Sequence, residues 1–170
     1  MRVTTRTTTR STRARWTARG IGLGLTTALA VTLGAGPASA AAVNPVFVPG
    51  NPALSCPNGA EGFRIPENDG DPLVDTTVPV TVGTESGTVI VNFSDDLKFV
   101  SFDTTGNLAI RQVTVKGGNN ANRYIYDANS TPSFPDGKAQ DSNLVSPLNM
   151  GGQIPTISHV DFCVIEGDGS

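Results

Sequence analysis

"VTVKGGNNANRYIYD", residues 113–127, is the stretch that decides the fold. Apolar and polar residues alternate in "VTVK" and again in "RYIYD", and glycine and asparagine separate the two runs. Alternation with a period of two is typical of half-buried strands. Gly117, Gly118 and Asn119 tolerate the positive φ angles that a tight connection requires. We therefore predict two antiparallel strands and interpret "KGGNNAN" as the turn between them.

Runs of the same kind recur along the chain from residue 76 to residue 165. They are "TTVPVTV", "TVIVNF" with the turn "GTESG" before it, "LKFVSFD", "LAIRQVTVK" and "TISHVDFCVI". In the last run we expect one face to carry core residues, Val160, Phe162 and Val164, and the opposite face to carry Ile157, His159, Asp161 and Cys163. No segment after residue 40 shows a sustained period of 3.6 residues. The sequence therefore predicts an all-β fold, an antiparallel two-sheet β-sandwich with one disulfide.

Proline and glycine mark the limits of this pattern. Pro79 has no N–H to donate to a ladder, so its strand is predicted to lie at a sheet edge. Two polar segments rich in proline and glycine, residues 56–72 and 127–143, are predicted to be surface connections.

The first 40 residues have the order of a secretory signal peptide. Six arginines and no acid come first, a segment of small and apolar residues follows, and "PASA" ends the stretch at Ala40. This order predicts cleavage between Ala40 and Ala41. We expect residues 1–40 to be a signal peptide and residues 41–170 to be one secreted extracellular domain, with no membrane anchor and in a monomeric state.

Removal of such a signal changes the charge balance. Residues 41–170 keep 6 of the 12 basic residues and all 15 acidic residues, which gives 6 − 15 = −9. A chain with so few cations, and no basic stripe, is not expected to bind nucleic acid or an anionic membrane.

Cys56 and Cys163 are the two cysteines of the chain. In an exported protein, two cysteines predict one disulfide. Cys163 is predicted to lie on the face opposite the core, so the segment around Leu54 and Cys56 must cross that face. Two cysteines and one histidine without C-x-x-C spacing fall short of the usual zinc set, and we expect neither a metal nor a cofactor.

His159 and Asp161 are the first candidates for catalysis, because residues two apart in a strand share a face. Ser158 points to the other face, and the G-x-S-x-G elbow of serine hydrolases is absent. A small hydrolase that uses His159 and Asp161, or an acidic pair, stays an alternative. Weak calcium binding at Glu67–Asp71 stays open as well. "STPSFPDGK", residues 130–138, is the segment that a secreted enzyme inhibitor would need as an exposed rigid loop.

Three segments together resemble a family of exported bacterial β-domains of uncharacterised activity. They are "QVTVKGGNNANRYIYD", "DSNLVSPLNMGG" and "ISHVDFC", and the match runs from Phe99 to Cys163. The signature is VxVKGGxNANxYxY, then DxxLxxPxN, then ISHxxFC. The chain departs from it where Phe99 and Phe102 stand in place of a tryptophan before the "VKGG" strand. The resemblance implies an extracellular β-module and assigns no catalytic residue.

The expected function is therefore that of a secreted, non-catalytic module. It would bind an extracellular polymer or another protein, or have a structural role at the cell wall. Successive glycines can form an anion-binding nest, and two tyrosines can form an aromatic platform. The candidate binding residues are Lys116, Gly117, Gly118, Asn119, Asn122, Tyr124, Tyr126 and His159.

Overall fold

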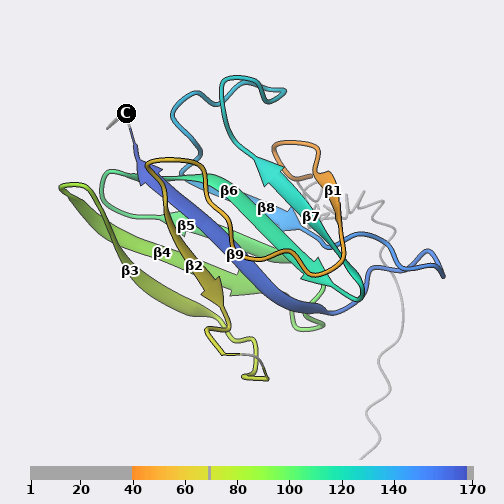
Figure 1. Ribbon diagram of the computed structural model, residues 1–170. Coiled ribbons are helices and arrows are strands. Elements are labelled where there is room, and N and C mark those ends of the chain that lie inside the picture. Colours follow the sequence, from red (N-terminus) through yellow and green to blue (C-terminus); the bar gives the residue numbers. More distant parts are fainter. Residues whose placement is uncertain (1–39, 69, 168–170) are drawn as a thin grey trace, which may run out of the picture. The chain divides into compact units, whose positions relative to one another are not determined.

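The computed structural model describes residues 40–68 and 70–167, and the predicted signal peptide lies outside them except for Ala40. The described residues form nine strands in two sheets (Figure 1). Sheet A has the order β1 (Val46–Pro49), β7 (Asn120–Ile125), β6 (Leu108–Gly117), β9 (Ile157–Glu166) and β2 (Glu61–Ile65). Sheet B has the order β3 (Thr76–Val82), β4 (Glu85–Phe93), β5 (Val100–Thr104) and β8 (Gln140–Leu144).

Every ladder in both sheets is antiparallel, so the predicted all-β sandwich is confirmed. The described residues contain no helix long and apolar enough to span a membrane.

The core lies between the two sheets, and its residues come from strands of both. Phe162 of β9 stacks on Phe63 of β2 with ring centroids 5.1 Å apart and meets Phe102 of β5 edge-on at 6.0 Å. Phe102 in turn lies 5.9 Å from Tyr126, the residue that follows β7. Offset and edge-on aromatic pairs of this kind add to the stabilisation from burial alone. This chain of rings joins the two sheets across the middle of the core.

Two predictions about strand position are confirmed. β3, which contains Pro79, is an edge strand of sheet B. β6 and β7 form the predicted hairpin, with Lys116 opposite Ala121 and Gly117 opposite Asn120. The β3–β4 hairpin is tighter than "GTESG" suggested, because β3 ends at Val82 and β4 begins at Glu85.

The predicted position of Ile157 is wrong, because a bulge changes the phase of β9. Lys116 pairs with His159, but the next residue, Gly117, pairs with Ile157, so Ser158 is an extra residue. One extra residue turns the side chain before it to the other face. Ile157 therefore belongs to the buried core, whereas His159, Asp161 and Cys163 lie on the outer face of sheet A as predicted.

The two segments predicted as connections are not free of strands. The first contains the whole of β2, and the second contains the start of β8, which begins at Gln140. β1 was not predicted from the sequence either. These strands have four or five residues, and their neighbours in the sheets, β9, β5 and β7, supply the pairing.

A segment that we call the strap, residues 52–56, covers the outer face of sheet A. The disulfide between Cys56 and Cys163 fixes one end of it, as predicted. The Gln112 side chain donates to the Ser55 carbonyl at 3.0 Å, and Arg64 donates to the Pro52 carbonyl at 3.2 Å. These contacts place the strap over Gln112 of β6 and beside the Arg64–Asp161 pair, and both Gln112 and Asp161 are buried.

Candidate functional site

Asp161 is a buried carboxylate on the outer face of sheet A. Its side chain is 2% exposed, and both carboxylate oxygens accept hydrogen bonds from Arg64, at 2.6 Å from Nε and 3.0 Å from Nη2. A forked guanidinium–carboxylate contact of this kind has two strong, charge-assisted hydrogen bonds. The fork joins β9 to β2 beneath the strap, so Asp161 has a structural partner.

His159 also lies on this outer face, two residues before Asp161. It pairs across the ladder with Lys116 of β6 and is 5% exposed. A general base must reach the proton that it removes from a substrate. The buried imidazole and the engaged Asp161 carboxylate favour a structural role for both residues.

Asn122, Tyr124 and Tyr126 lie on the core side of β7 and just after it. The Tyr124 hydroxyl donates to the Val145 carbonyl at 3.0 Å and accepts from the Val145 N–H at 2.9 Å. Asn122 donates to the same carbonyl at 3.0 Å. Burial raises the pKa of Tyr124, and burial followed by the charge of Asp141 raises the pKa of Tyr126. These three candidates brace the interior and do not form an exposed platform.

The β6–β7 turn holds the remaining candidates at one end of the sandwich. Lys116 Nζ donates to the Gly118 carbonyl, and Gly118 has a φ of +60°. Gly117 is packed so closely that an added Cβ would lie 2.4 Å from Ser146 Oγ and 2.9 Å from the Thr156 carbonyl. Gly118 and Asn119 are exposed at the tip.

A cleft of about 520 Å³ lies between this turn and the loop 147–155, and we call it the end cleft. Its lining includes Gly117, Gly118, Asn119, Asn120, Leu148 and Met150. Leu148 is 60% exposed and Met150 is fully exposed. The structure therefore adds two apolar side chains to the turn that the sequence singled out. The signal that marks them is an isolated pair of apolar residues within a segment of proline, asparagine and glycine.

Asn149 fixes the shape of this loop. Its side-chain oxygen accepts from the Gly151 N–H at 2.9 Å and from the Gln153 N–H at 3.0 Å. Its own N–H donates to the Gln153 carbonyl at 2.9 Å. Asparagine side chains that mimic a backbone turn in this way stabilise short loops. Leu148 and Met150 thus project from an ordered loop.

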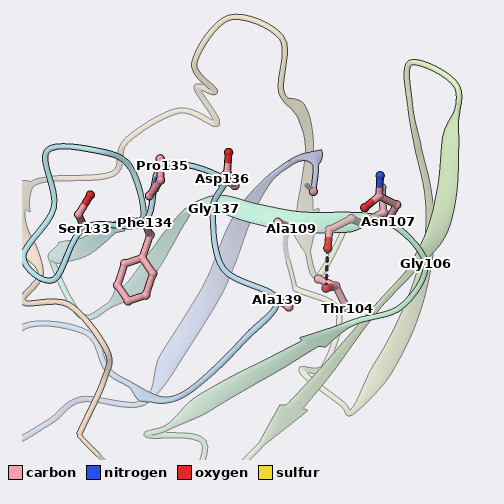
Figure 2. A pocket seen from close by; sticks show the side chains of 12 residues that line it. Thr104, Gly106, Asn107, Ala109, Ser133, Phe134, Pro135, Asp136, Gly137 and Ala139 are labelled. Carbon is pink, nitrogen blue, oxygen red and sulfur yellow. Dashed lines mark hydrogen bonds between the residues drawn. The ribbon is translucent and has the colours of Figure 1, made fainter. Parts of the chain in front are cut away.

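A second cleft, of about 580 Å³, lies beside the loop 130–138 (Figure 2). Figure 2 shows Ser133 and Asp136 on one side of this loop and the Phe134 ring turned to the other. The ring packs edge-on against Tyr126 at 6.0 Å, and Lys138 Nζ lies 4.8 Å from its centroid. The Asp127 carbonyl accepts from the Phe134 N–H at 2.8 Å and from Ser130 Oγ at 2.7 Å. The loop predicted for an inhibitor is therefore internally braced, and its aromatic residue points inward.

A third cleft, of about 690 Å³, is lined by residues of β2, β3 and the segment between them. Glu67 and Asp71 lie on it, and Asp71 accepts from the Asn68 side chain at 3.2 Å. Asp69, which belongs to the possible calcium site, lies outside the described residues. Within the described part of the chain, no three His, Cys, Asp or Glu side chains come together as a metal site.

Comparisons with protein-family models, with curated proteins and with solved structures each found no match. The resemblance to exported bacterial β-domains stays a prediction.

Proposed function

We propose that this chain is a secreted, non-catalytic β-sandwich module that binds an extracellular polymer or protein through the end cleft. The observation that carries the proposal is the pair Leu148 and Met150, both exposed beside a cleft. Clustered exposed apolar side chains, rimmed by polar groups, are typical of interaction sites.

The lining of the end cleft suits recognition better than catalysis. Gly117 and Gly118 present backbone, and Asn119 and Asn120 present amides, so the lining offers no acid, base or nucleophile of ordinary reactivity. A rigid loop loses little conformational entropy on binding, and the hydrogen bonds of Asn149 provide that rigidity.

Two other exposed apolar residues, Val46 and Phe47, fit this role less well. Val46 and Phe47 lie on β1, a four-residue edge strand that ends in Pro49 and follows Pro45. Short edge strands flanked by proline are a common protection against pairing with other chains. We therefore assign binding to the end cleft.

Secretion is the other half of the proposal. The basic, apolar and small-residue order of residues 1–40 supports it. The Cys56–Cys163 disulfide is of the kind that persists in oxidising compartments.

A binding assay with insoluble polymers tests the site. Purified residues 41–170 are mixed with peptidoglycan sacculi, chitin or cellulose, and depletion from the supernatant is measured. We expect depletion by at least one polymer, and an affinity roughly tenfold lower for the Leu148→Ser/Met150→Ser variant, because each anchor loses apolar contact. Val74→Ser is the matched control, since Val74 is 59% exposed on the third cleft.

Equal binding by the control and the double variant would contradict the assignment of the end cleft. Product release from any of these polymers that disappears in His159→Ala would replace the proposal with the hydrolase alternative.

One observation also favours an inhibitor function, namely the braced loop 130–138 with exposed residues at 131–133. A protease inhibitor needs such a loop, because rigidity lowers the entropic cost of binding. A panel of secreted serine proteases, assayed with wild type and with Ser133→Asp, tests it. Inhibition that the variant loses would support this function, and no inhibition of any protease would exclude it for that panel.

A further inference from the structure

The carboxylate of Asp141 has an unusual set of partners for a side chain on an edge strand. It accepts from the Tyr126 hydroxyl at 2.8 Å and from the Ser142 N–H at 2.8 Å. It also accepts the Ala42 N–H with both oxygens, at 2.9 and 3.1 Å. Three donors therefore make four contacts with the two carboxylate oxygens, which fixes the carboxylate beside the start of the folded domain.

The residue that precedes Ala42 is the predicted first residue of the secreted protein. Ala41 and Ala42 are half-buried and pack against the core cluster. The Ala42 nitrogen donates to Asp141, and the Ala41 nitrogen precedes it by one residue. Because consecutive Cα atoms lie about 3.8 Å apart, the Ala41 nitrogen is within one residue length of an atom that already contacts the carboxylate.

We propose that signal cleavage creates a cation beside this carboxylate, and that Asp141 is the binding site for the new α-ammonium group of Ala41. The inference rests on the secretion half of the proposed function. Hydrolysis of the Ala40–Ala41 bond consumes one water, whose hydroxyl goes to the Ala40 carbonyl carbon and whose proton goes to the Ala41 nitrogen. With an ordinary pKa of about 8, the amine takes a second proton at neutral pH.

The charges around Asp141 favour a cation at this position. A cleft of about 500 Å³ runs from Ala40 past Ala42 to Asp141, and its lining also includes Asp103 and Lys138. Lys138 Nζ lies over the Phe134 ring, 4.8 Å from its centroid. The titratable groups that face the site are thus Asp103, Asp141, Lys138 and the Tyr126 phenol. Two carboxylates against one lysine leave the cleft with a negative charge that an α-ammonium group offsets.

The test is a double-mutant cycle on the exported protein. The N-terminal residue is first determined by mass spectrometry. Thermal unfolding is then compared for the free amine and its Nα-acetylated form, in the wild type and in Asp141→Asn. We expect acetylation to lower the Tm of the wild type by about 3–5 °C, as a partly buried charge-assisted contact does in a domain of this size. In Asp141→Asn the shift should fall below about 1 °C.

Asp136→Asn is the matched control, because Asp136 is exposed and lines the second cleft, not the cleft beside Asp141. It should leave the effect of acetylation intact. Equal effects of acetylation with and without Asp141, or loss of the effect in Asp136→Asn alone, would overturn the inference.

Two further results keep the test decisive. If Asp141→Asn does not fold, the acylation rate of the wild-type amine at pH 7 should be roughly tenfold lower in the folded protein than in urea, because an ion pair keeps the amine protonated. Equal rates would overturn the inference. An exported protein that begins at another residue would also overturn it and leave secretion standing, whereas a retained, uncleaved chain would contradict both.

Discussion

The Cys56–Cys163 disulfide closes a loop that includes almost the whole folded part of the chain. The two residues are 107 positions apart. Replacement of both by alanine frees the unfolded chain from this constraint, and the chain-entropy relation gives a loss of about 5 kcal/mol for a loop of this length. The folded state keeps the other contacts of the strap, to Gln112 and Arg64. We therefore expect the free energy of unfolding to fall by about 4–5 kcal/mol.

Urea denaturation measures this loss directly. The single tryptophan is Trp16, outside residues 41–170, so tyrosine fluorescence reports only on Tyr124 and Tyr126, both in the core. Circular dichroism at far-ultraviolet wavelengths provides a second probe of the same transition. Reduction of the wild type should give the same loss as Cys56→Ala/Cys163→Ala. A loss below about 1 kcal/mol in both experiments would refute the loop-entropy argument.

Three more perturbations test the fold and the site. Arg64→Ala leaves the buried Asp161 carboxylate without its guanidinium and should cost about 3 kcal/mol, measured by urea denaturation. Gly117→Ala drives a methyl group against its neighbours and should cost about 1–3 kcal/mol in the same assay. Absorbance at about 295 nm should show no tyrosinate from Tyr124 or Tyr126 in the folded protein near pH 10, where free tyrosine titrates. Because burial raises the pKa of both phenols, the unfolded chain releases protons first, and stability should fall as the pH rises above about 10.

Each of these perturbations has a control in the chain. Lys98→Ala breaks the exposed contact to Asp96 and should not change stability measurably. Gly151→Ala, in the exposed loop of the end cleft, meets only the Asn149 side chain at 3.3 Å and should be tolerated. A Gly117→Ala variant as stable as Gly151→Ala would contradict the packing argument. Tyrosinate that appears near pH 10 while the far-ultraviolet signal remains native would contradict the burial argument.

Alternation of apolar residues predicted the long strands well, because successive side chains of a strand point to opposite faces and only one face is buried. It predicted the faces of β9 from Val160 to Val164, but it could not locate the bulge at Ser158, since the extra residue depends on pairing with β6. β2 was missed because "EGFRI" is short and lies among proline and glycine. Its position depends on β9, which is about 100 residues further along the chain.

The candidate site was predictable only in part, for the same reason. The β6–β7 turn follows from local sequence, because glycine and asparagine have distinctive backbone preferences. Its proximity to Leu148 and Met150 does not, because that contact depends on how the loop 147–155 packs against the end of sheet A. Likewise, the link from Ala42 to Asp141 spans 99 residues.

The order of strands in sheet A has a consequence for how the protein is made. β6 and β7 emerge from the ribosome together, but among the described residues β2 pairs only with β9, the last of the nine strands. A growing polypeptide that stops before Ile157 therefore has no partner for β2 and no second thiol for Cys56. The pairing of β2 and the disulfide can therefore form only after β9 has been synthesised, however early β2 itself leaves the ribosome.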